Sequence, residues 1–117
     1  MNFLPAILMN AGTAAKLEAG PLLQFANGRR NDPDGKALTI GIRPEHIRIN
    51  PEGIPLRIDL VEPLGSETLL HGRLAAPGEA ALVMRLAGRA PESDVLGVEF
   101  PAEEIHVFDA GTGLRLP

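Results

Sequence analysis

Hydrophobic residues in this chain form short runs that proline, glycine, asparagine or aspartate interrupt every few residues. The clearest run alternates, with apolar residues at every second position from Ile54 to Leu60 and the charged Arg57 and Asp59 between them. Such alternation is typical of an antiparallel strand with one face on a core and the other in water. With 11 prolines and 13 glycines in 117 residues, little room remains for long helices. The pattern predicts an all-β chain of short antiparallel strands with at most one or two short helical turns.

Strands are expected wherever an apolar or β-branched run lies between two such breaks. Loops are expected at residues 31–35, 77–78 and 88–94, where turn-forming residues cluster. Because small antiparallel sheets remove exposed edges by closing, this many short strands favours a closed or nearly closed barrel. The expected strands are residues 3–9, 22–26, 37–43, 47–49, 54–62, 68–74, 80–86, 95–100, 105–108 and 114–116.

Size and composition predict one folded domain over residues 1–117. Hydrophobic residues make up 44% and charged residues 22% of the chain, as in an average soluble domain, and no linker divides it. The chain has no cysteine, which excludes disulfides and thiolate chemistry and agrees with a cytosolic location. A net charge of −4 and the absence of Trp and Tyr argue against a nucleic-acid partner.

A nucleotide site is not expected in this chain. A phosphate-binding loop ends in Gly-Lys followed by Ser or Thr, so that backbone amides and the lysine surround the phosphates. Lys36 follows Gly35, but Gly28 lies too far back to be the first glycine of the loop, and Ala37 replaces the magnesium-binding hydroxyl. This segment is better explained as a hairpin loop.

Other catalytic and metal-binding patterns are also weak. Ser66 lies in a turn and lacks the Gly-x-Ser-x-Gly pattern of a nucleophile elbow. His46, His71 and His106 are too far apart in the sequence to indicate a zinc site. We therefore expect no catalytic residue, no metal and no cofactor in this chain.

Two carboxylate pairs have structural explanations. Glu62 and Glu67 flank a turn, and residues 103–104 follow Pro101, which suits the first turn of a short helix whose positive end attracts acids. Paired carboxylates can divide acid and base roles in glycosidases. No apolar pocket around them is evident from the sequence, so we do not expect that chemistry here.

The segment Arg43-Pro44-Glu45-His46 marks a strand that ends in a turn, because proline fixes φ and keeps the residues before it extended. The planar guanidinium of Arg43 suits a carboxylate or exposed carbonyls. We expect it to act as a clamp inside the domain, with Glu62 or Glu67 as its partner. A surface contact with a ligand or a partner protein is the alternative.

Several segments resemble, in order, the regulatory OB-like domain (transport-associated OB, TOBE) at the carboxyl end of the ATP-binding subunits of sugar-type ABC importers, the maltose and glycerol-3-phosphate group. The matching segments are MNFLP at residues 1–5, GIRPEH at 41–46, VEPLGSET at 61–68, FPAEEIHVFD at 100–109 and GLRL at 113–116. The resemblance implies an OB-like β-barrel without catalytic function. The residues expected to make structural or regulatory contacts are Arg43, Glu45, His46, Glu62, Gly65, Glu67 and Arg73.

The resemblance also implies partners. In that family the domain is attached to an ATPase domain that binds ATP and Mg²⁺, pairs with a second copy of the subunit and lies under membrane permease subunits, at the cytoplasmic face of the bacterial membrane. Because this chain lacks the ATPase portion, we expect it to be part of a longer protein. Two functions stay open: regulation and dimerisation through subunit or partner contacts, and sensing of a solute or anion with Arg43, His46 and Arg73 as donors.

Overall fold

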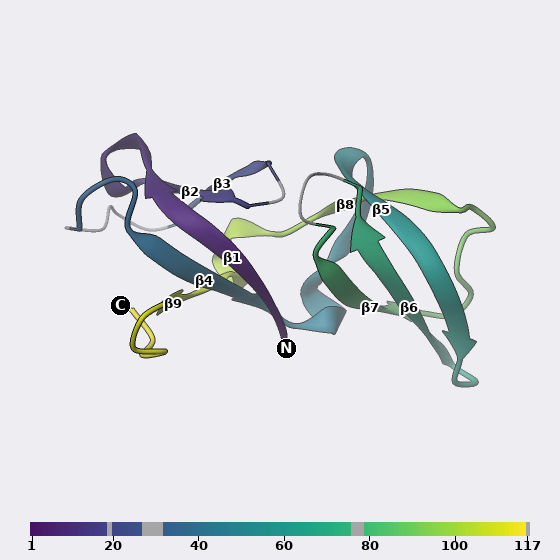
Figure 1. The fold of residues 1–117 in the computed structure, drawn as a ribbon. Coiled ribbons are helices and arrows are strands. Elements are labelled where there is room, and N and C mark those ends of the chain that lie inside the picture. The colour runs from purple at the N-terminus through teal and green to yellow at the C-terminus, as the bar shows by residue number, and fades with distance from the viewer. Residues whose placement is uncertain (19, 27–31, 76–78, 117) are drawn as a thin grey trace.

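The computed structural model describes residues 1–18, 20–26, 32–75 and 79–116, whose regular elements are strands and short turns (Figure 1). Three short turns of 3₁₀ type separate some of them: η1 (Asn10–Gly12), η2 (Pro44–His46) and η3 (Ala102–Glu104). The strands are β1 (Asn2–Met9), β2 (Ala14–Leu17), β3 (Leu22–Gln24), β4 (Ala37–Ile42), β5 (Arg48–Pro63), β6 (Glu67–Leu74), β7 (Ala81–Ala87), β8 (Val95–Glu99) and β9 (His106–Asp109).

The strands form two antiparallel sheets that lie side by side in an elongated molecule of 44 × 25 × 24 Å (Figure 1). Sheet A has the order β3-β2-β1-β4-β9, and sheet B has the order β7-β6-β5-β8. The all-β class and the OB-like fold are confirmed, with hydrogen bonding divided between two sheets instead of one continuous ring. The chain crosses from sheet A to sheet B through η2 and returns through η3. Pro44 and Pro101 stand at these crossovers and cannot donate to a ladder, which helps to end each sheet there.

The β1–β2 hairpin corrects one prediction. The sequence Ala14-Ala15-Lys16-Leu17 lacks β-branched residues and has helical propensity, so it was not among the expected strands. It forms β2 because it pairs with β1 on one side and β3 on the other. In η1, Asn10 and Ala11 have φ of 55° and 56°, so η1 is a left-handed turn. The right-handed turns among the described residues, η2 and η3, match the expected helical turns.

β5 is one bent strand where the sequence predicted two. Its pairing with β8 shifts between Ile49 and Ile54, so the expected break is a bulge within the strand. Gly53 permits the bend, because a Cβ there would collide with the backbone of Val98. A second shift, against β6, lies between Ile58 and Leu60. It ends the alternation, and Leu60 is 56% exposed where the pattern predicted a buried side.

The remaining expectations have mixed outcomes. The loop at residues 88–94 and the turn near residues 33–35 are present. The expected strand at residues 114–116 is wrong, because an isolated bridge between Arg115 and Phe108 is its only ladder contact among the described residues. Residues 77–78 and Asn31, expected in loops, lie outside the described residues. Among the described residues, no helix has the length and hydrophobicity to span a membrane.

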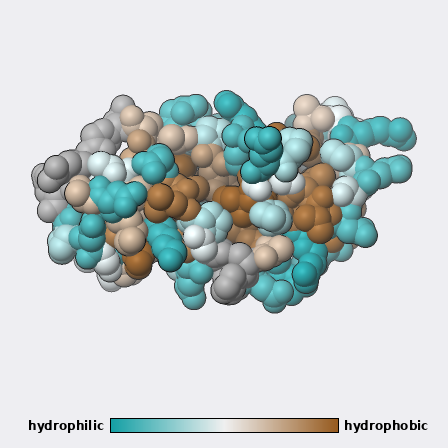
Figure 2. Space-filling view, turned by 90° about the horizontal axis from the view of Figure 1, so that it is seen from above, coloured by the Kyte–Doolittle hydropathy of each residue, from teal (hydrophilic) through white to brown (hydrophobic). Residues whose placement is uncertain are grey.

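One core joins the two sheets. A single cluster of buried side chains draws Leu8 and Ile40 from sheet A and Leu56 and Met84 from sheet B, all 0% exposed. Burial of each large aliphatic side chain stabilises the fold by about 1.5–3 kcal/mol. Hydrophobic residues also reach the surface over both sheets, between hydrophilic ones (Figure 2). The two sheets therefore pack on a shared core.

Candidate functional site

The Arg43–His46 motif forms the first crossover between the sheets. β4 ends at Ile42, Arg43 remains extended with φ −76° and ψ 144°, and Pro44 begins η2. The turn closes when the backbone N–H of His46 donates to the carbonyl of Arg43 over 3.0 Å. Ile47, which is 2% exposed, anchors the turn in the core. The predicted strand ending in a turn is confirmed.

His46 connects the two crossovers. Its Nδ1 lies 3.2 Å from Oε2 of Glu104 in η3, so one close polar contact links the segment that enters sheet B with the segment that leaves it. The same Nδ1 has no accessible surface and no hydrogen bond of acceptable geometry. The distance allows an ion pair when the imidazole is protonated, whereas the angles do not suit a hydrogen bond.

Positive charge gathers around this contact. Burial lowers the pKa of His106, and the nearby Arg115 and Arg43 lower it further, while Glu104 acts in the opposite direction. Among the described residues, no carboxylate pairs with Arg43 or Arg115. We call Arg43, His46, Glu104, His106 and Arg115 the waist cluster. Its two arginines outnumber its single carboxylate, in a chain whose net charge is −4.

The expected pairing of Arg43 with Glu62 or Glu67 is wrong. Oε1 of Glu62 lies 3.0 Å from Nε2 of His71, and Glu67 pairs with Nε of Arg85. In the register of sheet B these pairs are diagonal neighbours on adjacent strands, within reach of long side chains. Hydrogen bonding to Arg85 lowers the pKa of Glu67.

Arg73 also belongs to sheet B. Its Nε and one terminal nitrogen donate to the two carboxylate oxygens of Asp59 over 3.0 and 3.2 Å, and this hydrogen bonding lowers the pKa of Asp59. Glu79 lies 3.8 Å away on the other side. Arg73 is thus held within a row of exposed pairs and is not in the waist cluster. We call this row the ion-pair face; it comprises Asp59, Glu62, Glu67, His71, Arg73, Glu79 and Arg85. Exposed pairs of this kind contribute little to stability.

Gly65 and Glu45 have simpler surroundings. Gly65 has φ of 90° in the β5–β6 turn, a conformation that favours glycine, and Leu64 N–H closes this turn by donating to the carbonyl of Glu67 over 2.7 Å. Glu45 is exposed on η2, and its charge helps to raise the pKa of Arg85 on β7. Apart from Glu45, the expected contact residues therefore separate into the waist cluster, the ion-pair face and a hairpin turn.

Asn2 is a residue that the sequence analysis missed. Its Nδ2 donates to the carbonyl of Val83 over 2.8 Å, and its Oδ1 accepts the Val83 N–H over 2.8 Å. The same Nδ2 lies 3.3 Å from the carbonyl of Ile42. The side chain thus acts as a strand partner for the outer edge of β7 and ties sheet A to sheet B. Only the register of both sheets reveals this role.

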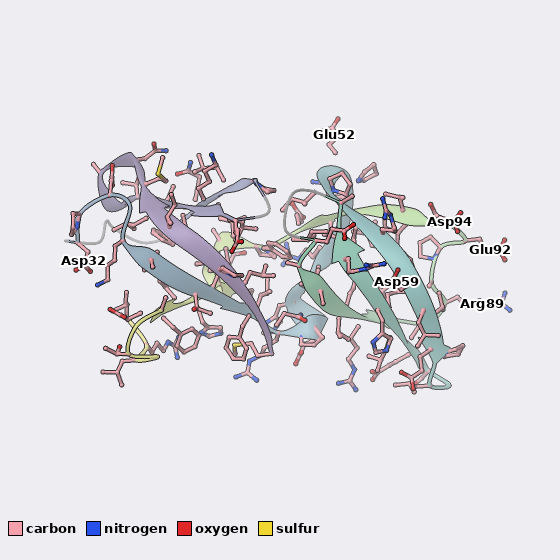
Figure 3. The ribbon with its side chains drawn as sticks, in the orientation of Figure 1. Asp32, Glu52, Asp59, Arg89, Glu92 and Asp94 are labelled. Carbon is pink, nitrogen blue, oxygen red and sulfur yellow. The ribbon has the colours of Figure 1, made fainter. Side chains whose placement is uncertain are left out.

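Other charged side chains are spread out. Figure 3 shows Asp32 at one end of the molecule, Glu52 on the β5 bulge, and Arg89, Glu92 and Asp94 on the loop at the far end of sheet B. In the part of the chain that the structure describes, no three histidines or carboxylates gather closely enough to hold a metal ion.

Comparison with known families agrees with this arrangement. The model of the TOBE domain matches residues 40–108, more than half of the chain, and the model of the MalK OB fold domain matches residues 1–47. The chain belongs to the TOBE domain family. The two matches meet at η2, so the first crossover of this TOBE domain lies where one family model gives way to the other.

Individual relatives match the TOBE domain over nearly its whole length. The sn-glycerol-3-phosphate import ATP-binding protein UgpC of Escherichia coli O1:K1 / APEC is 39% identical over 99% of this chain and 33% of its own length. The proteins of the same name from Shigella sonnei (strain Ss046) and Salmonella paratyphi A (strain ATCC 9150 / SARB42) are 38% and 36% identical over the same shares. The TOBE domain described here spans about a third of the length of these relatives.

Proposed function

We propose that this chain is the non-catalytic regulatory and dimerisation domain of the ATP-binding subunit of an ABC importer for glycerol 3-phosphate or carbohydrate. The observation that carries the proposal is the match to such subunits over 99% of the chain. The domain acts by shifting the equilibrium between open and closed subunit pairs. Such allostery needs a differential contact energy of only about 1–3 kcal/mol between the two states.

ATP and Mg²⁺ belong, in this proposal, to the part of the subunit beyond this chain. Lys36, the lysine nearest to a phosphate-loop pattern, follows Gly35 in the β3–β4 connection, and its Nζ lies 2.9 Å from Asp109. That ion pair supports a structural role for the lysine. The proposed partners are the subunit's own ATPase domain, a second copy of the subunit and membrane permease subunits. The proposed location is the cytoplasmic face of the bacterial membrane.

The test compares the complete subunit with a form from which residues 1–117 are removed. We expect the shortened subunit, assembled with its permease, to retain weakened ATP hydrolysis and to lose regulation of transport by solute or partner protein. The dimer of shortened subunits should also dissociate at a higher protein concentration than the dimer of complete subunits, as measured by sedimentation. Regulation and dimer affinity that both survive the removal would refute the proposal.

Sensing of a solute or anion is a second candidate function, and the waist cluster favours it. Arg43 and Arg115 supply cationic donors without a carboxylate partner of their own among the described residues, whereas Arg73 is already paired. Isothermal titration with glycerol 3-phosphate should give heat that Arg115→Gln abolishes. Arg89→Gln is the matched control, because Arg89 is exposed on the far loop. No heat with the native chain would exclude sensing and leave the assembly function standing.

A further inference from the structure

The outward face of β1 is an ordered apolar ridge. Its inward residues, such as Leu4 and Leu8, are 1% and 0% exposed, but Met1, Phe3 and Ile7 on the other side are 43%, 58% and 40% exposed. Pro5, also exposed, continues the row. We call Met1, Phe3, Pro5 and Ile7 the β1 ridge. Contiguous exposed apolar surface on a soluble domain typically marks an interaction site.

Neighbouring residues hold this ridge in place. Phe3 packs edge-on against Phe108 of β9, with ring centroids 5.8 Å apart. Gly41 on β4 leaves the space that Met1 and Phe108 occupy, because a Cβ on Gly41 would collide with both side chains. The ridge is therefore a preformed surface, and a partner would not need to order it.

Three hollows follow the ridge from sheet A onto sheet B. The first, of about 490 Å³, is lined by Ile7, Pro5 and Ala37, among others. The second, of about 400 Å³, shares Pro5 with the first and also contacts Phe3. The third, of about 500 Å³, shares Phe3 with the second and ends at Val83 on β7. Successive hollows share a ridge residue and therefore lie next to one another along the ridge; together we call them the groove.

The rim of the groove carries both signs of charge. Lys16 and Glu18 border the first hollow, and Asp59 and Arg73 border the third, where they pair with each other. An anionic lipid surface or a nucleic acid would require a uniformly basic rim. The mixed rim instead suits a folded protein surface with an apolar centre.

We propose that the β1 ridge and its groove are the surface on which the ATP-binding portion of the same subunit packs, an inference that rests on the proposed function. The relatives are named ATP-binding proteins, and this chain, which matches a third of their length, carries no phosphate loop. Their ATP-binding portion therefore lies in the remaining two thirds. Covalent attachment gives that portion a high effective concentration at this surface. The chain's N-terminus also lies beside the junction of the two sheets, so any segment preceding Met1 would leave the domain at the Met1 end of the ridge (Figure 1).

The test introduces charge into the ridge of the complete subunit through the double substitution Phe3→Lys/Ile7→Lys. The matched control is Leu60→Lys/Leu64→Lys, at residues that are 56% and 51% exposed at the far end of sheet B. Each pair is made in the complete subunit and in residues 1–117 alone, which form a domain with one core, and calorimetry measures the unfolding temperatures. We call Phe3→Lys/Ile7→Lys the ridge pair and Leu60→Lys/Leu64→Lys the control pair. In residues 1–117 alone, we expect the ridge pair to change the midpoint of thermal unfolding no more than the control pair does.

In the complete subunit we expect the ridge pair to lower the midpoint of the domain by at least about 2 °C, because lysine ammonium groups would enter a buried interface. The control pair should leave it unchanged. An unchanged midpoint with the ridge pair, or equal losses with both pairs, overturns the inference. A dimer of residues 1–117 that the ridge pair dissociates in sedimentation also overturns it, because the occupant is then a second copy. Failure of the unsubstituted subunit to hydrolyse ATP would instead refute the proposed function.

Discussion

Replacement of Asn2 by alanine tests whether one side chain fastens the two sheets together. The amide of Asn2 makes two hydrogen bonds of 2.8 Å with the backbone of Val83 and a longer one, of 3.3 Å, with the carbonyl of Ile42. Val83 lies on the outer edge of β7, so no further strand replaces these bonds. Asn2→Ala therefore leaves a backbone N–H and a carbonyl of a half-buried residue without partners.

The size of the effect follows from the bonds lost. An intramolecular hydrogen bond contributes about 0.5–1.5 kcal/mol net, so the two bonds to Val83 contribute about 1–3 kcal/mol together. Water can reach part of this edge, which places the expected loss in the free energy of unfolding at about 2 kcal/mol. For a domain of this size such a loss lowers the unfolding midpoint by roughly 8 °C.

Urea unfolding followed by circular dichroism measures this loss. The matched control is Gln24→Ala, which removes a side-chain amide from the exposed edge strand β3, where the described residues make no side-chain hydrogen bond. We expect Gln24→Ala to change the free energy of unfolding by less than about 0.5 kcal/mol. If Asn2→Ala falls in the same range as this control, the assigned link between the sheets is wrong.

Three further predictions concern the bulge, the Lys36–Asp109 pair and the waist. Gly97→Ala should destabilise the chain by more than about 2 kcal/mol in urea unfolding, because the new Cβ would collide with the backbone of Asn50; near-native stability would refute the close packing. The hydrogen bond from Lys36 lowers the pKa of Asp109 from 3.8 to about 2. The unfolded chain therefore binds the proton first, and stability should fall as the pH drops from about 4 towards 2, a loss that Asp109→Asn should reduce. Burial keeps the pKa of His106 below 6.5, so stability should also fall as the pH drops below 6.5. His106→Gln should make stability depend less on pH in this range. A His106 signal, assigned by NMR, that titrates above 6.5 would contradict the prediction.

Local patterns predicted most of the strands but not how they assemble. Alternation and turn residues place β1, β6 and β7 within a residue or so of their observed limits, because these strands have one buried and one exposed face. The pattern missed β2, whose residues have helical propensity, because strand pairing on both sides overrides that propensity. The pattern also predicted two strands in place of β5. The Pro-Glu-Gly sequence at residues 51–53 fits a turn between two strands and a bulge within one strand equally well.

Side-chain partners were predictable only in part, for a similar reason. The sequence indicated that Arg43, Glu62 and Glu67 were candidates for ion pairs, but the partners depend on the register between strands. A diagonal position on sheet B brings His71 to Glu62 and Arg85 to Glu67, and no local signal encodes that offset. Arg115 is separated from Arg43 by most of the chain, so their joint effect on His106 is visible only after both crossovers are placed.

The two crossovers show why the candidate residues gather at the waist. Each crossover has a proline at or just before the start of a short 3₁₀ turn and ends at an isoleucine, Ile47 or Ile105, that packs on or into the core. At these points the ladder is interrupted, so side chains are released from the strict alternation of a strand and can converge from both segments. His46 and Glu104 meet there because each belongs to one of the two turns. A ligand or partner that changed this contact would act on both connections between the sheets at once, whereas a change on the ion-pair face would remain within sheet B.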